Sequence, residues 1–126
     1  MISAIHGSQN WSSGNTQVVT NDDVSTVYLH GNKIALVDNS TVTIFDGGWQ
    51  SNTTKSRLNA LITEFCNFGE GVFQKDFLWY VRKYVGIARN DDGQPVMTDD
   101  GHMTAVYNDD DFHSGYVFTG TCCRYH

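Results

Sequence analysis

The chain has 126 residues, of which 40% are hydrophobic and 13% aromatic, and its formal net charge is −6. This length and composition are typical of one folded domain and exclude a disordered chain. No apolar run approaches the roughly 18 residues of a membrane-spanning helix, and residues 1–6 lack the features of a secretory signal. The three cysteines are odd in number, which disfavours a disulfide framework, so we expect a soluble cytoplasmic protein.

The first segment, residues 1–23, is rich in Ser, Asn, Gly and Thr, with Trp11 and Val18 among its few apolar anchors. Polar chain ends of this kind are often irregular. We therefore predict an irregular N-terminal arm over 1–23.

Three short β-rich runs follow at 26–30, 33–37 and 41–45, and turn residues separate them. In the third run, Val and Ile alternate with Thr, as on a strand with one buried face. The runs and turns together predict a three-stranded antiparallel meander.

After the third run, the spacing of apolar residues changes from the alternation of a strand to the three- and four-residue spacing of a helix. The positions i, i+3, i+4 and i+7 are occupied by Leu58, Leu61, Ile62 and Phe65. This spacing predicts a central amphipathic helix. We expect Thr53 or Thr54 to cap its N-terminus, and Asn67 and Gly69 to end it.

The chain beyond the helix is also rich in strand signals. Residues 72–81 are aromatic and β-branched, which favours a strand or a hairpin that turns near Lys75-Asp76. Residues 85–126 contain seven aspartates. Turn signals are expected at 90–93, 98–101 and 108–111, with short strands at 94–97, 103–107 and 116–119.

These elements predict the fold class and the organisation of the chain. We expect one α+β domain over 1–126, with a small antiparallel sheet and one central helix. Its βββα-β core would span 24–84, and an acidic part rich in β-structure and turns would span 85–126.

The start of the predicted helix is the most distinctive candidate site. Its first turn carries two cations and no acid, which opposes the helix dipole unless an anion compensates. Free N–H groups, nearby hydroxyls and a glycine pair are suited to holding a phosphate or carboxylate. The alternatives are a counter-charge from Asp46 or from an acid of the C-terminal third, or simple solvation of the two cations. The predicted anion or ligand site consists of Gly48, Trp49, Thr53, Thr54, Lys55 and Arg57.

Other chemistry has weaker support. Aromatic residues interleave with cations over 73–84, which is typical of single-stranded nucleic-acid binding but also of a strand with one buried face. A metal site at Cys122, Cys123, His113 and His126 lacks a zinc-ligand spacing. No spacing of nucleophile and base indicates catalysis, and the sequence predicts no cofactor.

Two segments carry a resemblance to a known set of proteins. The first runs from Gly47-Gly48-Trp49 through Thr53-Thr54-Lys55-Ser56-Arg57-Leu58-Asn59, and the second is Gln74-Lys75-Asp76-Phe77-Leu78-Trp79-Tyr80. They resemble small proteins of tailed bacteriophages that share a Gly-Trp-x-Thr-Thr-Lys-x-Arg-x-Asn stretch followed by Gln-Lys-x-x-x-Trp-Tyr. The resemblance implies a phage origin and an infected bacterial host.

The resemblance leaves three functions open. The first is a non-catalytic accessory protein that binds a host macromolecule, with a host protein as the expected partner, in host takeover or counter-defence. The second is a nucleotide or single-stranded nucleic-acid binder that uses the helix N-terminus. The third is a minor virion component. We expect no membrane partner, and a homo-oligomer is compatible with the sequence.

Overall fold

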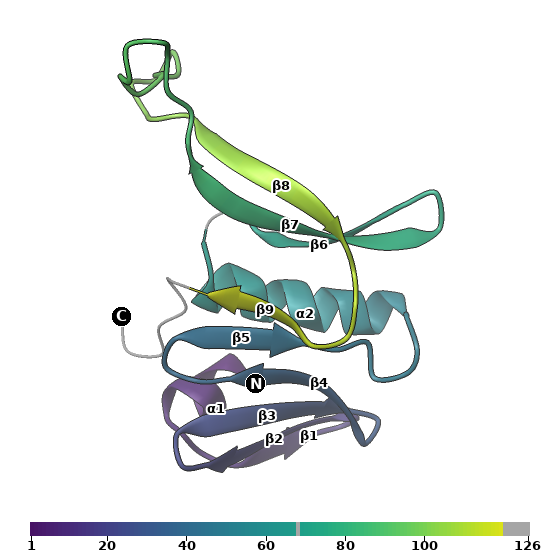
Figure 1. Cartoon of the computed structure of the whole chain (residues 1–126). Helices are drawn as coiled ribbons and strands as arrows, with labels where there is room; N and C mark the ends of the chain where they lie inside the picture. The colour runs from purple at the N-terminus through teal and green to yellow at the C-terminus, as the bar shows by residue number, and fades with distance from the viewer. Residues whose placement is uncertain (68, 120–126) are drawn as a thin grey trace.

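The computed structural model describes residues 1–67 and 69–119 and shows an α+β fold with two antiparallel sheets and two helices (Figure 1). The α+β prediction is therefore confirmed. The larger sheet has the strand order β1-β2-β3-β4-β5-β9, formed by Trp11–Ser13, Thr16–Asn21, Val24–Leu29, Asn32–Val37, Thr41–Ile44 and Tyr116–Thr119. The smaller sheet has the order β6-β7-β8, formed by Gly71–Lys75, Leu78–Ile87 and Ala105–Asp111. The helices are α1 (Ile2–His6) and α2 (Asn52–Phe65).

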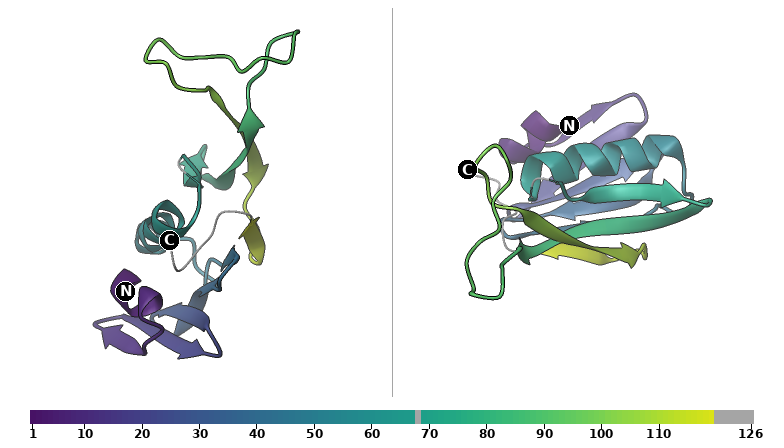
Figure 2. Two further views of the ribbon diagram at one scale, coloured as in Figure 1. Left: turned by 90° about the vertical axis from the view of Figure 1, so that its left-hand side faces the viewer. Right: turned by 90° about the horizontal axis from the view of Figure 1, so that it is seen from above.

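Helix α2 holds the two sheets together. It contacts β4 and β5 of the larger sheet and β6 of the smaller one, and it lies between them (Figure 2). Its apolar stripe is fully buried at Leu58, Leu61, Ile62 and Phe65. Burial of such side chains stabilises a fold by about 1.5–3 kcal/mol each, so this helix is the centre of the core.

The N-terminal segment differs from its prediction. Residues 1–23 do not form an irregular arm, because they fold as α1, β1 and β2, and β2 pairs with β3 along its whole length. Val18 and Ile5 are completely buried. The pattern of Thr16 and Val18 inward and Gln17 outward is a strand signal, but polar neighbours obscured it. Pairing with β3 satisfies the backbone of this polar segment.

The helix boundaries also differ from their prediction. The N-cap is Ser51, not Thr53 or Thr54, and the Ser51 Oγ accepts a hydrogen bond from the Thr54 backbone N at 3.1 Å. Ser51 has extended backbone angles, as an N-cap residue requires. The helix ends at Phe65, just before Asn67 and Gly69.

The acidic C-terminal part is more strand-like than its composition indicated. Residues 108–111, predicted as a turn, lie in β8, where Asp109 pairs with Arg82 of β7. Residues 94–97 form no strand and make only isolated bridges. Strand β9 joins the larger sheet beside β5, so the core extends beyond 24–84.

The turn between β4 and β5 is closed by one carboxylate. Asp38 accepts hydrogen bonds from the Ser40 N at 2.9 Å, the Thr41 N at 2.6 Å and the Thr41 Oγ1 at 2.9 Å. Burial alone would raise the pKa of Asp38, but these hydrogen bonds outweigh it and lower the pKa. The carboxylate form therefore stabilises the folded state.

We expect Asp38→Asn to lower the free energy of unfolding by about 1 kcal/mol at pH 7, because asparagine keeps a neutral acceptor but loses the charge that strengthens these hydrogen bonds. Because the folded-state pKa is depressed, the contribution is present above the unfolded pKa of about 3.9 and is lost as pH falls through the folded value. Urea denaturation of wild type and variant should therefore give curves that converge below pH 4. The exposed carboxylate Asp91 provides the control, Asp91→Asn. A difference independent of pH would contradict this assignment.

Candidate functional site

The two cations of the predicted anion site point to different parts of the molecule. The Lys55 Nζ lies 3.5 Å from the Gln74 Oε1 of β6, whereas the Arg57 Nε lies 3.4 Å from the Thr16 Oγ1 of β2. Residues two positions apart on an α-helix are rotated by about 200° from one another, which accounts for the separation. Lys55 and Arg57 therefore do not converge on one ligand.

The other predicted site residues lie at or near the start of α2. Gly48, Trp49 and Thr53 are exposed, but Thr54 is buried and its Oγ1 lies 3.0 Å from the Ser51 Oγ. The Asp46 carboxylate accepts a hydrogen bond from the Gly48 N at 2.8 Å.

Asp46, Trp49 and Thr54 all line a hollow of about 220 Å³. Its carboxylate makes this hollow unfavourable for an anion. Within the described residues, Asp46 forms no ion pair with Lys55 or Arg57, so it is not their counter-charge.

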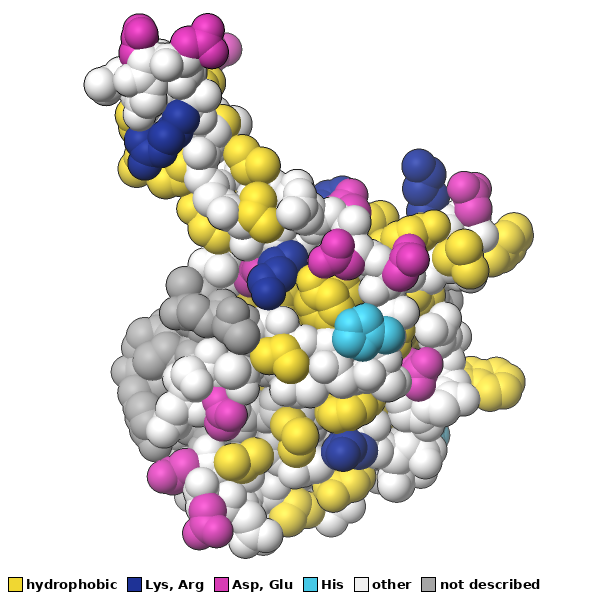
Figure 3. Space-filling view, viewed as in Figure 1, with side chains coloured by type: hydrophobic (Ala, Val, Ile, Leu, Met, Phe, Trp, Pro, Cys, Tyr) yellow, Lys and Arg dark blue, Asp and Glu magenta, His cyan; other side chains and the backbone are white. Residues whose placement is uncertain are grey.

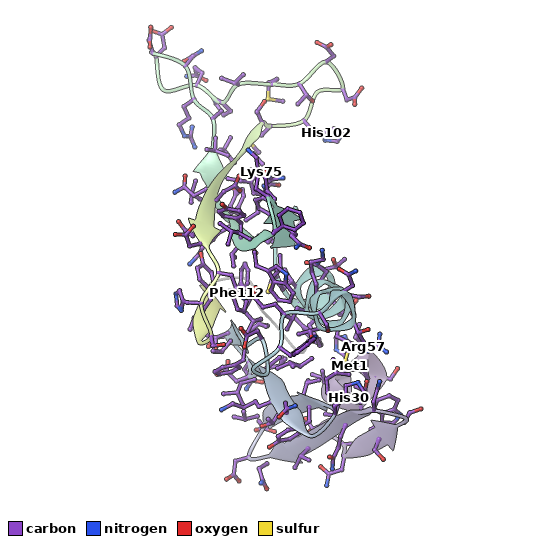
Figure 4. The ribbon with its side chains drawn as sticks, turned by 90° about the vertical axis from the view of Figure 1, so that its right-hand side faces the viewer. Met1, His30, Arg57, Lys75, His102 and Phe112 are labelled. Atoms are coloured by element: carbon purple, nitrogen blue, oxygen red, sulfur yellow. The ribbon has the colours of Figure 1, made fainter. Side chains whose placement is uncertain are left out.

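Arg57 lines a separate hollow between α2 and the N-terminal strands. This hollow has a volume of about 250 Å³ and is lined by Met1, Trp11, Ser13, Thr16, Ser56, Arg57 and Ala60. Arg57 and Met1 lie side by side in Figure 4. The sequence predicted Arg57 as a ligand-binding residue but not its neighbours on β1 and β2, because that segment was expected to be irregular.

The segment of aromatic and basic residues divides between the two faces of the smaller sheet. Trp79 and Val81 are buried in the core. On the opposite face Phe73 stacks on Tyr80 with 5.6 Å between ring centroids, and Arg82 lies over Phe73.

Acidic residues accompany the cations on this outer face. Arg82 is 2.9 Å from Asp109, and the pairing raises the pKa of Arg82 through the hydrogen bond and lowers that of Asp109. Asp111 is directly opposite Tyr80. These carboxylates repel phosphates, so this face is poorly suited to single-stranded nucleic acid.

The turn between β6 and β7 has an unusual residue. Lys75 pairs with Leu78, so the loop is only Asp76-Phe77, and both have positive φ, 52° and 67°. Hairpin loops of this geometry strongly favour Asn-Gly or Asp-Gly. Among the described residues, the other non-glycine residues with positive φ are Ser8, Asp22, Asp23 and His30. Asp and His tolerate this conformation better than Phe does. Phe77 is also 92% exposed.

A second exposed apolar region lies on the extension of β7 and β8, which projects from the body of the molecule (Figures 1 and 2). We call residues 85–106 the arm. Hydrophobic side chains are exposed along it (Figure 3), namely Val85, Val96, Met97, Met103 and Val106. Two turns of the form x-Asp-Asp-Gly, at 90–93 and 98–101, close its outer part.

The described residues have no clustered metal ligands and no membrane-spanning helix. Residues 1–67 and 69–119 contain no cluster of three or more His, Cys, Asp or Glu side chains able to hold a metal ion. Cys122, Cys123 and His126 lie outside the described residues. No described helix is long and apolar enough to cross a membrane.

The fold and these surfaces define a small α+β protein with exposed apolar features, and comparison with known families identifies its origin. Residues 1–119 match the family described as Kyanoviridae Gp96 protein, and the chain belongs to this family. It is therefore a phage protein, as predicted. No curated protein and no solved structure matches the chain. The chain has three residues between Trp49 and Thr53, whereas the Gly-Trp-x-Thr-Thr pattern of the predicted resemblance has one.

Proposed function

We propose that this phage protein is a non-catalytic accessory protein that binds a host protein in the cytoplasm of the infected cell, in host takeover or counter-defence. The observation that carries the proposal is Phe77, a large aromatic side chain held in solvent at the tip of the β6–β7 hairpin. We call residues 75–78 the hairpin tip.

The hairpin tip is costly for folding. Left-handed backbone costs a non-glycine residue about 1–2 kcal/mol, and leaving a Phe side chain in water forfeits about 1.5–3 kcal/mol of burial. Phe77 is 92% exposed and Leu78 is 60% exposed. Phe77 weakens the fold in both ways. Such a residue is suited to binding, because aromatic anchors dominate protein–protein affinity.

The surroundings of the hairpin tip indicate the chemistry of the partner. Asp76 and Asp111 are exposed and form no ion pair within the part of the chain that the structure describes. Both line a hollow of about 280 Å³ beside the stacked rings of Phe73 and Tyr80. The complementary partner is a host protein with an apolar pocket for Phe77 and basic residues at its rim.

The arm is a weaker anchor than the hairpin tip. Its exposed apolar side chains are less accessible than Phe77, with Met97 and Met103 each at 53%. Within the arm, only glycines have positive φ, so its backbone shows no comparable strain. We therefore assign the main contact to the hairpin tip.

The test is the double substitution Asp76→Asn/Phe77→Gly, which installs the preferred turn. We expect the free energy of unfolding to rise by about 1 kcal/mol, because the strain at residue 77 is relieved. The same variant should lose a host protein that the wild-type chain retains stoichiometrically in a pull-down from host lysate. The retained protein should then bind the purified wild-type chain at least tenfold more tightly than the variant.

A matched control distinguishes binding at the hairpin tip from nonspecific hydrophobic binding. Trp49 is also a large aromatic residue, 75% exposed and outside the hairpin tip. Trp49→Ser should keep the partner that the double variant loses. Equal loss in both variants, or retention by the double variant, would rule out the hairpin tip as the binding site.

A further inference from the structure

We infer that the hollow between α2, β1 and β2 binds a nucleoside phosphate, with Arg57 on the phosphate and Trp11 against the base. This site is independent of the host-protein contact at the hairpin tip, which lies on the other sheet. It also differs from a site at the start of α2, because Ser51 already caps that end of the helix.

The charge of the hollow favours an anion. Arg57 contributes a guanidinium group to the hollow, and none of the lining residues has a carboxylate. The Nε is directed to the hydroxyl of Thr16, and Arg57 forms no ion pair with any carboxylate in residues 1–67 and 69–119. A guanidinium has five N–H donors in a planar fork that matches phosphate. In a chain of net charge −6, an arginine in a hollow whose lining residues include no carboxylate is a local site for an anion.

The neutral polar groups add to this preference. Ser13, at the end of β1, and Ser56, beside Arg57 on α2, are both exposed and line the hollow. Their hydroxyls can each donate a hydrogen bond to a phosphate oxygen. Thr16 is buried and already bonded to the Asn15 Oδ1 at 3.2 Å, so its role is to orient Arg57.

The apolar side of the hollow indicates a ring on the ligand. Trp11 is half-buried, and it lines the hollow with Met1 and Ala60. A planar base can stack on an indole, and such contacts contribute about 1–3 kcal/mol per base.

The size of the hollow limits what it can hold. Its volume is about 250 Å³, below the ~300–1,000 Å³ of most enclosed ligand sites. It therefore suits one base and one phosphate, with the sugar in solvent, and it is too small for a dinucleotide cofactor.

The experiment measures binding by isothermal titration calorimetry with four probes: AMP, UMP, inorganic phosphate, and a short single-stranded oligonucleotide with a 5′ phosphate. We expect at least one nucleotide probe to bind at least tenfold more tightly than inorganic phosphate. Preference for the mononucleotides identifies a free nucleotide as the ligand, and preference for the oligonucleotide identifies a nucleic-acid end.

Helix α2 supplies a matched pair of variants. Arg57→Ala and Lys55→Ala each remove one positive charge from the same part of the helix, but only Arg57 lines the hollow. Arg57→Ala should weaken nucleotide binding at least tenfold, and Lys55→Ala should change it less than twofold. Arg57→Gln, which keeps most of the side-chain stem, is the second variant if Arg57→Ala does not fold. Trp11→Leu should remove the preference for nucleotide over inorganic phosphate.

Three results would overturn the inference. The first is no binding of any nucleotide probe at millimolar concentration. The second is equal weakening by Lys55→Ala and Arg57→Ala, which indicates only the general charge of the helix. The third is equal affinity for AMP, UMP, the oligonucleotide and inorganic phosphate, which excludes a role for Trp11.

Discussion

Replacing Glu70 by alanine is expected to lower the free energy of unfolding by about 4 kcal/mol, because two backbone N–H groups lose a charged acceptor worth ~1.5–3 kcal/mol each. The Glu70 side chain is buried between α2 and β7. Its Oε1 accepts a hydrogen bond from the Asn67 N at 2.7 Å, and its Oε2 accepts one from the Tyr84 N at 2.9 Å. One carboxylate therefore ties the end of the helix segment to the strand that leads to the arm.

The substitution Glu70→Gln distinguishes the contribution of the side chain's packing from that of its hydrogen bonds. Glutamine has nearly the same size, but its NH₂ group must face one of the two backbone donors, so a loss of about 2 kcal/mol is expected. Urea denaturation followed by circular dichroism gives both values. Glu64→Gln is the control, because Glu64 is an exposed residue of α2 paired with His6 and should cost less than about 1 kcal/mol. A Glu70→Gln variant as stable as wild type would refute the role assigned to this carboxylate.

The second large effect is expected at Asn59, where alanine should lower the free energy of unfolding by about 3 kcal/mol. The Asn59 Nδ2 donates to the Val72 O at 2.9 Å, and the Asn59 Oδ1 accepts from the Val72 N at 2.7 Å. The amide thus pairs with the edge of β6 in place of a neighbouring strand. Because Val72 is buried, alanine leaves its N–H and C=O unsatisfied, at about 1–3 kcal/mol each.

The variant Asn59→Asp tests whether both hydrogen bonds between Asn59 and Val72 stabilise the fold. Aspartate keeps an acceptor for the Val72 N but places a second oxygen against the Val72 carbonyl, so it should destabilise at least as much as alanine. Thr63→Ala, at an exposed position of α2, is the control and should have little effect on denaturant midpoint. If Asn59→Asp matched wild-type stability, the two hydrogen bonds would not hold β6 to the helix.

The contact between Asn59 and β6 also depends on the neighbouring glycine. Gly71 stands next to Val72, and a Cβ there would lie 2.8 Å from the Asn59 Oδ1. Glycine therefore lets the amide reach the strand. Asn59 therefore has a structural role in holding β6 to α2.

Part of the architecture follows from local pattern. The helical stripe of Leu58, Leu61, Ile62 and Phe65 predicted α2. The run at 33–37 lies in β4, and the run at 26–30 lies in β3 except for its last residue, which is in the turn. These predictions succeed because burial of one face imposes a period on the sequence of each element. The opposite directions of Lys55 and Arg57 were also implicit in the helical period.

Other features could not be predicted from the sequence. Residues 16–21 form a strand because β3 offers a complete antiparallel partner, and their polar composition gave only a weak signal. The residues around Arg57 come from three separate elements, so no spacing along the chain could collect them. A signal did exist at Phe77, a bulky residue at the position where a tight hairpin favours glycine.

The amino-acid sequence by itself determined the α+β class and the position of the central helix, because these depend on the periodicity within single segments. The phage origin follows from the likeness of residues 1–119 to a phage family. Only the tertiary structure decided that the N-terminal segment joins the sheet, that Asn59 pairs with β6, and that Arg57 and Trp11 line the same hollow. Each of these is a contact between segments distant in sequence, and its free energy depends on which groups are brought together and removed from water.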